Sequence, residues 1–463
     1  MAGRASNDDD WARALEALRG EAFAEHLRGC RWFGGKAHTL RGVEVVDVLV
    51  LGDAGRMILL RVDYVEVAPE TYLLPLQVGP DGKMFDALED ENFRAMLMEI
   101  IAGGQRVMCG RGELVGICGA GFTETKRTVA SRVLKVEQSN SSVLYDELYF
   151  LKLYRRPEPG VNPDAELLRY FSEGHKFEQV PGYCGAIEYR AKGEEPRVLA
   201  LLVKNVVSDG DAWKNTLTAL GQEWTDERFE RMRLLGRRTA EMHLALAAET
   251  TDPNFAPERF DVIHQNAMRR SMGEAIQRMM RMLEGNQNVL PAECYDEVDG
   301  LLLREADILR YQEALMARPF CAELIRHHGD YHLGQVLDMR NDFCIIDFEG
   351  APGRPLSERR AKHTPLRDVA SMLRSFDYAA HAVGARQGDE WVARASQSFL
   401  DGYLSAAEGA PFLPGNEEEM GRLLEVCLLE KAVYEVCYEL NNRPDWAVIP
   451  LRGILRILGR SNE

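Results

Sequence analysis

The stretch "HHGDYHLGQVLDMRNDFCIIDFEG", residues 327–350, carries the clearest structural signal in the chain. It contains two runs that alternate apolar and polar residues and are joined by "RND", a pattern typical of a β-hairpin. The runs cover 333–339 and 343–348. Because a hairpin brings its two ends together, we expect the side chains of Asp330, Gln335 and Asp347 to converge.

Converging acids and an amide are groups that phosphoryl transfer requires. Asp330 on a loop can accept the proton of an acceptor hydroxyl, and Gln335 and Asp347 offer the oxygen ligands that Mg²⁺ prefers. The alternative is a surface hairpin with solvated acids. Ile345 and Ile346 favour burial of the segment, where a carboxylate without a partner is unfavourable. The stretch therefore indicates a phosphotransfer centre.

Composition argues against several classes of protein. The formal net charge of −17, from 56 Lys and Arg against 73 Asp and Glu, is unlike that of a nucleic-acid binder, which needs a basic surface. No apolar run approaches the length of a membrane span, and the acidic start is unlike a signal peptide. The nine cysteines form no C-x-x-C pair, so we expect reduced thiols and a cytoplasmic location.

The N-terminal part is expected to form a small α+β module. Residues 10–28 have the periodicity of an amphipathic helix, and 42–76 alternate in the manner of an antiparallel sheet. A second helix is expected over 85–104, where a glycine pair ends it.

A second sheet with one helix is predicted in the middle of the chain. Its strands are expected over 128–138, 142–156, about 185–191 and about 197–207. The helix begins with Asn162 as its N-cap and Pro163 as its first helical residue. From Asp211 onward helical patterns dominate. Sheets first and helices last indicate α+β lobes and not a doubly wound sheet.

The motif "HGDYHLGQ", followed by "IIDFEG", resembles the catalytic loop and metal motif of aminoglycoside phosphotransferase-like and protein-kinase-like enzymes. A longer set of blocks is similar to the maltokinase family: "RWFGGKAH", "EQSNSSVLYDELYFLKLYRRPEPGVNPDAEL", "HHGDYHLGQVL", "IIDFEGAPGRPLSERRAKHTPLRDVASMLRSFDYAA" and "KAVYEVCYELNNRPDWAVIPL". These blocks run from about residue 31 to 451, so the resemblance covers nearly the whole chain.

The resemblance implies a two-lobed, protein-kinase-like α+β fold with an N-terminal cap. The cap would cover 1–125, the nucleotide-binding small lobe 126–207, and the mostly helical C-lobe 208–463. ATP and Mg²⁺ are the implied cofactors.

The same resemblance implies roles for the marked residues. Asp330 matches the catalytic base, and Gln335 and Asp347 match the metal ligands. Glu349 stands where protein kinases have the glycine of their D-F-G motif, so we infer no activation-loop switching.

Further residues match positions that bind the nucleotide. Lys152 matches the lysine that pairs with the phosphates, and Glu166 matches its ion-pair partner, with Asp164 as a close rival. The alternative for Lys152 is a plain edge-strand charge. Side chains of the loop that replaces the glycine-rich loop would cradle phosphates, unless it is a plain hairpin turn: Gln138, Ser139, Asn140, Ser141 and Ser142. The adenine would be bound by the linking strand near Val203, Asn205 and Val206.

A helix expected over 429–446 carries a polar and aromatic face. Residues at helical spacing form it, and a tryptophan would extend it: Lys431, Tyr434, Glu435, Tyr438 and Trp446. Sugars bind to such mixtures of hydrogen-bonding groups and aromatic rings. The alternative is a solvated helix side with half-buried tyrosines.

Three further features flank these motifs. His328 lies beside Asp330, where packing or fixing of the loop is favoured over proton transfer. Arg367 and Asp368 are typical of a helix start. A cluster of cations adds local positive charge: Arg354, Arg359, Arg360 and Lys362.

From the resemblance we expect an ATP-dependent kinase that phosphorylates maltose at its anomeric hydroxyl and so feeds α-glucan or glycogen synthesis. Two alternatives stay open. One is a kinase of the same fold for glucosamine or another aminosugar. The other is a non-catalytic module that binds trehalose synthase, against which the intact set of Lys152, Asp330, Gln335 and Asp347 argues. Neither a nucleic acid nor a membrane is an expected partner.

Overall fold

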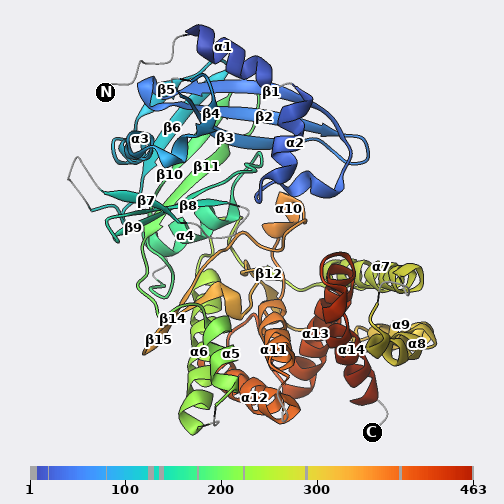
Figure 1. The fold of residues 1–463 in the computed structure, drawn as a ribbon. Helices are drawn as coiled ribbons and strands as arrows, with labels where there is room; N and C mark the ends of the chain where they lie inside the picture. Colours follow the sequence, from blue (N-terminus) through green and yellow to red (C-terminus); the bar gives the residue numbers. More distant parts are fainter. Residues whose placement is uncertain are drawn as a thin grey trace. The chain divides into compact units, whose positions relative to one another are not determined.

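A computed structural model describes residues 8–18, 20–79, 81–123, 130–134, 140–174, 177–222, 225–286, 290–384 and 388–460. The chain divides into two compact units, Met1–Val206 (unit 1) and Val207–Glu463 (unit 2). Sheets make up most of unit 1, and helices make up most of unit 2 (Figure 1).

Unit 1 begins with two short helices, α1 (Asp8–Ala17) and α2 (Glu21–Gly29). The single helix predicted over 10–28 is wrong, because Gly20 adopts an extended conformation and serves as the N-cap of α2. The apolar side chains Leu18 and Leu27 pack into a core beneath the first sheet.

The antiparallel sheet predicted over 42–76 is confirmed. Its strand order is β1-β2-β3-β4, with bounds β1 (Leu40–Val50), β2 (Arg56–Tyr64), β3 (Glu70–Val78) and β4 (Met84–Asp86). The following helix, α3 (Glu91–Ala102), is shorter than predicted. It begins only at Glu91, after the N-cap residue Asp90, whose carboxylate accepts a hydrogen bond from the Asn92 N–H.

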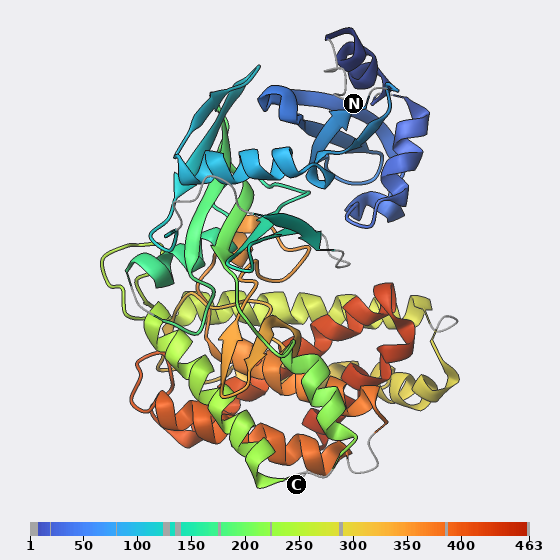
Figure 2. The ribbon, with the colours of Figure 1, turned by 60° about the vertical axis from the view of Figure 1, so that its left-hand side comes forward.

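The second sheet of unit 1 has seven strands in the order β5-β6-β10-β11-β9-β8-β7. Their bounds are β5 (Arg106–Met108), β6 (Gly112–Cys118), β7 (Ser131–Leu134), β8 (Ser141–Tyr145), β9 (Tyr149–Leu153), β10 (Tyr183–Ala191) and β11 (Arg197–Lys204). β5 and β6 precede residue 125, yet β6 pairs with β10. Helix α3 lies across this sheet and packs Leu97 and Ile101 into its core (Figure 2).

The strand predicted over 142–156 is in fact the hairpin of β8 and β9. Asp146 and Glu147 turn the chain, with φ of 45° and 55°. Consecutive positive φ angles are those of the tight turns that suit the twist of a hairpin. The next helix, α4 (Pro163–Glu173), begins as predicted, because the Asn162 side chain accepts a hydrogen bond from the Ala165 N–H.

Unit 2 consists mainly of helices: α5 (Ala212–Leu220), α6 (Asp226–Leu246), α7 (Val262–Asn286), α8 (Tyr295–Leu302), α9 (Glu305–Leu315), α10 (Leu356–Arg359), α11 (Leu366–Ala382), α12 (Gly388–Ala406), α13 (Glu417–Asn442) and α14 (Val448–Arg460). Helices α6 and α12 approach closely at Gly236 and Gly402. A Cβ atom at Gly236 would lie 1.9 Å from the carbonyl oxygen of Phe399, so glycine is required there. Short strands β12 (Glu258–Arg259) and β13 (Glu323–Leu324) pair near the first turn of α7.

The predicted hairpin of unit 2 is confirmed with shorter strands, β14 (Val336–Met339) and β15 (Asp342–Ile345). Residues 333–335 form a short 3₁₀ helix, η6 (Leu333–Gln335), ahead of it. Two ion pairs tie the hairpin to α6: Arg231 Nη2 lies 2.7 Å from Asp338 Oδ1, and Arg238 Nε lies 2.7 Å from Asp342 Oδ1. The hairpin is therefore a rigid base for the loops at its ends.

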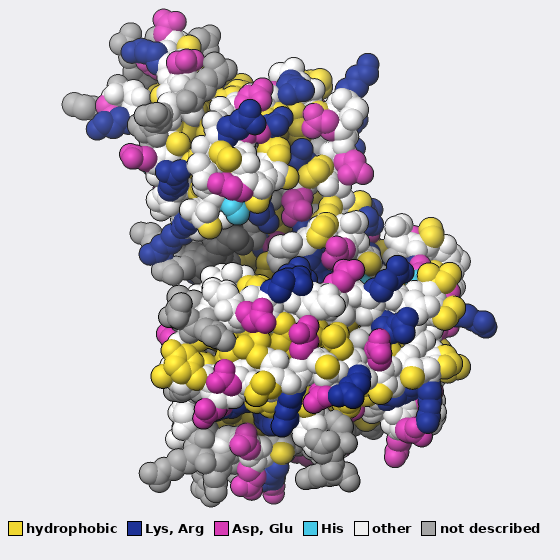
Figure 3. Space-filling model, turned by 90° about the vertical axis from the view of Figure 1, so that its right-hand side faces the viewer, with side chains coloured by type: hydrophobic (Ala, Val, Ile, Leu, Met, Phe, Trp, Pro, Cys, Tyr) yellow, Lys and Arg dark blue, Asp and Glu magenta, His cyan; other side chains and the backbone are white. Residues whose placement is uncertain are grey.

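Acidic and basic side chains are interspersed over the face of the molecule drawn in Figure 3. The acidic excess that gives the net charge of −17 therefore does not form a single continuous patch on that face. Among the described residues, every helix falls short of the length and apolar character that crossing a membrane requires.

Candidate active site

The loop that carries Asp330 is held in place by its neighbour His328. The His328 Nδ1 atom accepts a hydrogen bond from the Asp330 backbone N–H at 3.3 Å, and Nε2 donates to the Ile346 carbonyl oxygen at 2.9 Å. Because one ring nitrogen accepts and the other donates, these bonds require a neutral imidazole. The ring also packs on Phe348, with centroids 4.7 Å apart. His328 therefore joins the loop to the end of the hairpin.

A buried carboxylate on α11 clamps the same loop from the other side. Asp368 is 1% exposed, and its two oxygens accept hydrogen bonds from the backbone N–H groups of His328, at 2.7 Å, and Gly329, at 3.0 Å. A third bond, of 3.1 Å, comes from His243 Nε2, whose Nδ1 atom lies 2.9 Å from the Tyr403 hydroxyl. Asp368 thus positions the backbone next to Asp330.

The electrostatics of Asp368 favour its charged form. Burial alone would raise the pKa of this carboxyl group, but the neighbouring His327 and the hydrogen bond from His243 hold the pKa well below its usual range. The sequence predicted only a helix start at this position. The function of Asp368 was missed because its partners lie about 40 residues away along the chain.

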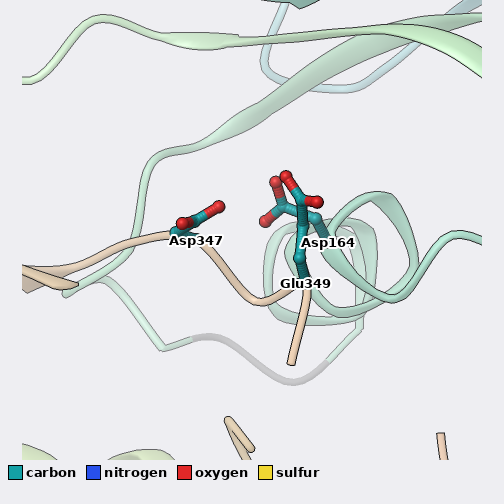
Figure 4. A group of neighbouring side chains, drawn as sticks. All are labelled: Asp164, Asp347 and Glu349. Atoms are coloured by element: carbon teal, nitrogen blue, oxygen red, sulfur yellow. The ribbon is translucent and has the colours of Figure 1, made fainter. Parts of the chain in front are cut away.

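The two predicted metal ligands of unit 2 lie in contact. Gln335 Nε2 donates a hydrogen bond to Asp347 Oδ2 at 3.0 Å, and Asp347 adopts a left-handed backbone conformation with φ of 69°. Carboxylate oxygens of Asp347 and Glu349 lie within 4.8 Å of each other on the loop after β15 (Figure 4). Carboxylate and amide oxygens are the hard ligands that suit Mg²⁺, so this donor set fits the ion. Glu349 is an additional candidate ligand that the sequence did not single out.

In unit 1, the carboxylate beside Lys152 belongs to Asp164. Lys152 Nζ on β9 lies 3.2 Å from Asp164 Oδ2, and the same oxygen accepts a hydrogen bond from the Tyr154 hydroxyl at 3.2 Å. Asp164 is buried in the first turn of α4, where Figure 4 also draws it. Glu166 lies half-buried two residues further along the same helix. From the sequence, Glu166 was assigned as the partner of Lys152, with Asp164 as a close rival.

The predicted phosphate loop is described only in part. Gln138 and Ser139 lie outside the described residues. Asn140 immediately precedes β8, and Ser142 is buried within that strand. The Ser141 hydroxyl accepts a hydrogen bond from Arg155 Nε at 2.8 Å.

The segment predicted to bind adenine follows β11. Val203 is buried in the strand. The Asn205 backbone N–H donates to the Leu148 carbonyl oxygen at 2.8 Å, and its side-chain amide donates to the Glu147 carbonyl oxygen at 2.9 Å. Asn205 thereby supports the turn between β8 and β9. Val206 is half-buried and ends unit 1.

Unit 2 contains a hollow that is partly open to solvent, which we call the acceptor hollow after its proposed role. Its wall includes His327 and Gly329 of the loop that carries Asp330 (residues 325–332, which we call the catalytic loop after its proposed role), Arg354 of the following segment, and Lys431 and Tyr434 of α13. Burial, and after it the charge of Asp330, raises the pKa of the Tyr434 hydroxyl. The hollow therefore lies within electrostatic reach of Asp330.

The predicted acceptor face of α13 divides into two groups. Lys431 and Tyr434 line the acceptor hollow, and Lys431 Nζ lies 5.3 Å from the Tyr434 ring centroid. Tyr438 stacks on Tyr434, with centroids 6.3 Å apart, and is 39% exposed. Trp446 stacks on Tyr378 of α11 at 6.0 Å. The part of the face nearest the catalytic loop is thus the part that faces the hollow.

Glu435 belongs to the packing between α13 and α11. Its Oε2 atom lies 2.8 Å from Nε of Arg374, and both side chains are at least nine-tenths buried. The next acid along the helix, Glu439, accepts a hydrogen bond from the Tyr378 hydroxyl at 3.0 Å. The predicted face of α13 is a broad stripe along the helix. One edge of this stripe therefore faces the hollow, and the other edge packs against α11.

The three carboxylates in the wall of the hollow each have a cationic or N–H partner. Glu430 forms two hydrogen bonds with Arg367, at 2.9 and 2.6 Å. Asp368 accepts hydrogen bonds from the backbone N–H groups of His328 and Gly329. Glu358 lies 3.5 Å from Arg354 and is 56% exposed. Lys431, by contrast, forms no ion pair with any described carboxylate.

Comparison with known proteins matches this architecture. Residues 26–87 match the family model of the maltokinase N-terminal cap domain. A glucosamine kinase of Streptacidiphilus jiangxiensis is 28% identical over 346 residues, which are 71% of this chain and 74% of that protein. A solved structure of a glucosamine kinase in complex with glucosamine, ADP and inorganic phosphate superposes with a TM-score of 0.68 at 22% identity, covering 92% of this chain and 96% of that one.

The chain is a maltokinase-like protein. The predicted fold class, a kinase-like α+β fold with an N-terminal cap, is confirmed. A second glucosamine kinase structure (crystal form B) superposes with a TM-score of 0.70 at 21% identity, covering 92% of this chain and 96% of that chain. A glucosamine kinase of Mycolicibacterium smegmatis is 22% identical over 334 residues, or 69% of this maltokinase-like chain and 77% of that protein.

Proposed function

We propose that this maltokinase-like protein is an ATP-dependent kinase that phosphorylates maltose at its anomeric hydroxyl, giving maltose 1-phosphate and ADP. The observation that carries the proposal is the acceptor hollow, whose wall combines the catalytic loop with Tyr434 and Lys431 of α13.

The lining of the hollow suits a neutral sugar. The Tyr434 ring offers a flat apolar surface to the face of a pyranose ring. Lys431 and Arg354 lie over that ring, 5.3 and 5.8 Å from its centroid, and can donate hydrogen bonds to hydroxyl groups. A sugar bound there would present a hydroxyl group toward the loop of Asp330.

Glucosamine is the second candidate acceptor, because the curated relatives bear its name. An ammonium group needs a carboxylate that is free to pair with it. Glu430 forms hydrogen bonds with Arg367, and Glu358 forms an ion pair with Arg354. The nearby Lys431 would repel a second cation. These charges favour maltose over glucosamine.

The reaction is an in-line displacement at the γ-phosphorus of ATP. Asp330 would accept the proton of the anomeric hydroxyl as its oxygen forms the new bond to phosphorus, and the bond from phosphorus to ADP breaks. Lys152 would offset negative charge on the phosphates. Asp368 and His328 would keep the Asp330 loop in place throughout.

Gln335, Asp347 and Glu349 would hold Mg²⁺, which supplies positive charge to the phosphates of ATP. ATP as the donor is supported by the structural relative whose name includes ADP and inorganic phosphate. A trehalose synthase that supplies maltose, and an α-glucan synthesis that uses the product, are the partners this proposal implies.

Measurement of ADP release tests the proposal. The protein would be assayed with ATP and Mg²⁺ against maltose, glucose, glucosamine, trehalose and an aminoglycoside. We expect release that depends on maltose and saturates with its concentration. ADP release with glucosamine but with no other sugar would leave the proposed site unchanged and would make glucosamine the acceptor in place of maltose. Nucleotide binding without turnover on any sugar would instead support a non-catalytic module.

A further inference from the structure

Arg155 joins the two sheets of unit 1. It follows β9 of the seven-stranded sheet and is 3% exposed. Its Nε atom donates a hydrogen bond to the Ser141 hydroxyl at 2.8 Å, and its Nη2 atom is paired with the Asp86 carboxylate. Ser141 begins β8, whereas Asp86 ends β4 of the four-stranded sheet. The four-stranded sheet lies within the N-terminal cap domain, and we call it the cap sheet.

The other contacts of Arg155 also lie on the side of the cap. Its guanidinium lies over the Trp32 ring, with Cζ 5.2 Å from the ring centroid. The backbone N–H of Leu73 in β3 donates to the Arg155 carbonyl oxygen at 2.8 Å. Leu59 and Leu73 of the cap sheet belong to the same hydrophobic core as Leu151 of β9. The cap sheet therefore shares a core with β9 and is hydrogen-bonded to the chain just after it.

The strand register shows which side chains share a face with Lys152. Strands β8 and β9 are antiparallel, with Ser141 opposite Leu153 and Ser142 opposite Lys152. Opposite residues lie on the same face of a sheet, and consecutive residues alternate between faces. Ser141 therefore lies on the face of the shared core, to which Leu153 belongs. The next residue, Ser142, lies on the face of Lys152.

The guanidinium of Arg155 fixes the start of β8 relative to the cap sheet. A buried cation is stable only where its donors have partners. Because the donors of an arginine form a rigid planar fork, one side chain can bind two acceptors in a fixed geometry. Here the two acceptors are Ser141 and Asp86. The Asp86 carboxylate, 37% exposed, also accepts a hydrogen bond from the Leu88 N–H at 2.9 Å. The position of Ser141 thus depends on the cap sheet.

We propose that Arg155 is a positioning residue for the nucleotide, through which the cap sheet holds Ser141, and with it the start of β8, in place beside Lys152. The inference rests on the proposed function, because it takes ATP as the ligand on the Lys152 face. The cap sheet then contributes to ATP affinity through β8. The acceptor hollow lies in unit 2, so the affinity for maltose does not depend on this link.

Arg155→Met tests the link, because methionine keeps an apolar chain over Trp32 and removes the donors. The Asp86 carboxylate is partly exposed, so water can hydrate it in the variant. We expect the Kd for ATP, measured by calorimetry without sugar, to rise about tenfold, an ordinary size for coupling between two sites. The KM for maltose at saturating ATP should stay within about twofold of the wild-type value. Arg155→Lys keeps the charge without the fork and should recover little of the ATP affinity.

Arg156→Met is the matched control. The Nη1 atom of Arg156 pairs with Glu70 of the cap sheet at 2.6 Å. This variant also removes an ion pair to the cap sheet but leaves the contact with Ser141 in place. Its Kd for ATP should therefore change by less than about twofold. An equal rise of the Kd in Arg155→Met and Arg156→Met would overturn the assignment.

A double-mutant cycle shows whether the cap sheet acts through Arg155. Asp86→Asn weakens one end of the link, and Ser141→Ala removes the acceptor at the other end. Each variant should raise the Kd for ATP about threefold, and the double variant hardly more than either alone, because members of one hydrogen-bond network are not additive. Effects that multiply, or wild-type Kd values in both single variants, would overturn the inference. Both changes are conservative, so the cycle decides the question even if Arg155→Met does not fold.

The outcomes separate this inference from the proposed function. If the wild-type protein binds no ATP, the proposed function itself fails. If it binds ATP and phosphorylates a sugar while Arg155→Met keeps the wild-type Kd, only the role of Arg155 is overturned. A rise in the KM for maltose as large as the rise in the Kd for ATP would indicate a general loss of structure, and would also overturn that role.

Discussion

The catalytic loop and the wall of the acceptor hollow meet at two consecutive histidines with opposite surroundings. Both ring nitrogens of His328 are occupied, one by the Asp330 N–H and one by the Ile346 carbonyl oxygen. His327 is also buried, but its Nδ1 atom has no hydrogen-bond partner among the described residues. The first arrangement holds the backbone of the loop in place, and the second leaves a buried polar atom without a partner among the described residues.

The same division recurs on helix α13. Glu435 is buried in an ion pair with Arg374, while Lys431, one turn earlier, borders the hollow without an ion pair to a described carboxylate. Groups that position the site have their hydrogen-bonding capacity filled by the protein. Groups that we propose to bind substrate, such as Lys431, form no ion pair with a described carboxylate. The predictions below test this division.

The largest effect is expected at the proposed base. Asp330→Asn should lower kcat on the order of a thousandfold, because the amide cannot take the proton of the acceptor hydroxyl. ATP affinity, measured by calorimetry, should stay within about threefold of the wild-type value. A variant that retains kcat within about tenfold would show that Asp330 is not the base.

The second largest loss is expected at the proposed metal site. Asp347→Asn should lower kcat on the order of a hundredfold and weaken binding of Mg²⁺ or Mn²⁺, because a charged oxygen ligand is lost. Chelation of the metal should abolish ADP release in the wild-type protein, and added Mg²⁺ should restore it. Wild-type metal affinity in the variant, measured directly with Mn²⁺, would exclude Asp347 as a ligand.

Removal of the clamp should affect both stability and rate. Asp368→Asn weakens the hydrogen bonds to the loop, because one of the two acceptor oxygens is replaced by an NH₂ group and buried N–H groups lose their acceptor. We therefore expect the free energy of unfolding to fall by about 3 kcal/mol. We expect kcat to fall about thirtyfold, since a small misplacement of a reacting group is costly. Asp389→Asn, at an exposed acid of α12, should change stability by no more than about 0.5 kcal/mol. Equal behaviour of the two variants would contradict the clamp.

The two sides of α13 should respond differently to substitution. Glu435→Gln breaks a buried ion pair and should lower the free energy of unfolding by about 3 kcal/mol, with the KM for maltose almost unchanged in protein that is still folded. Lys431→Met should leave stability unchanged and raise the KM for maltose about tenfold. Chemical denaturation and steady-state kinetics on both variants check the contrast. The reverse pattern would place Glu435 in the acceptor site.

The smallest predicted effect is on the pH dependence of stability. His327 has a pKa of about 4 in the folded protein, against 6.5 for an ordinary histidine. As the pH falls from about 6.5 to 4, the unfolded chain therefore binds more protons and the folded state loses stability. His327→Phe should lose stability less steeply over this range in denaturation experiments. Asp368, with its lowered pKa, acts only at more acidic pH, so an unchanged slope would show that His327 is not buried as described.

Local sequence patterns were sufficient for much of the fold. Alternating residues predicted the sheet over 42–76 and the hairpin after Asp330, and the Asn162-Pro163 pair predicted the start of α4. The errors lie where the pattern continues through a turn. Asp146 and Glu147 resemble strand residues in sequence, yet they adopt positive φ and divide one predicted strand into two.

The site was less accessible to prediction, because its contacts join distant residues. Asp368 lies about 40 residues from the amides that it binds, and no local pattern distinguishes it from a helix start. Helical spacing placed Lys431, Tyr434 and Glu435 on one face but could not tell which of them would meet α11. That choice depends on the packing of α13 in three dimensions.

The account depends most on one claim, that a neutral sugar receives phosphate at its anomeric oxygen. A mixture of equal amounts of maltose and glucosamine would be incubated with ATP, Mg²⁺ and the protein, and the products followed by ³¹P–¹H correlation NMR, with Asp330→Asn as the blank. We expect one new phosphate signal, coupled to the anomeric proton of maltose. Phosphate on glucosamine, or on a hydroxyl of maltose other than the anomeric one, would contradict the account.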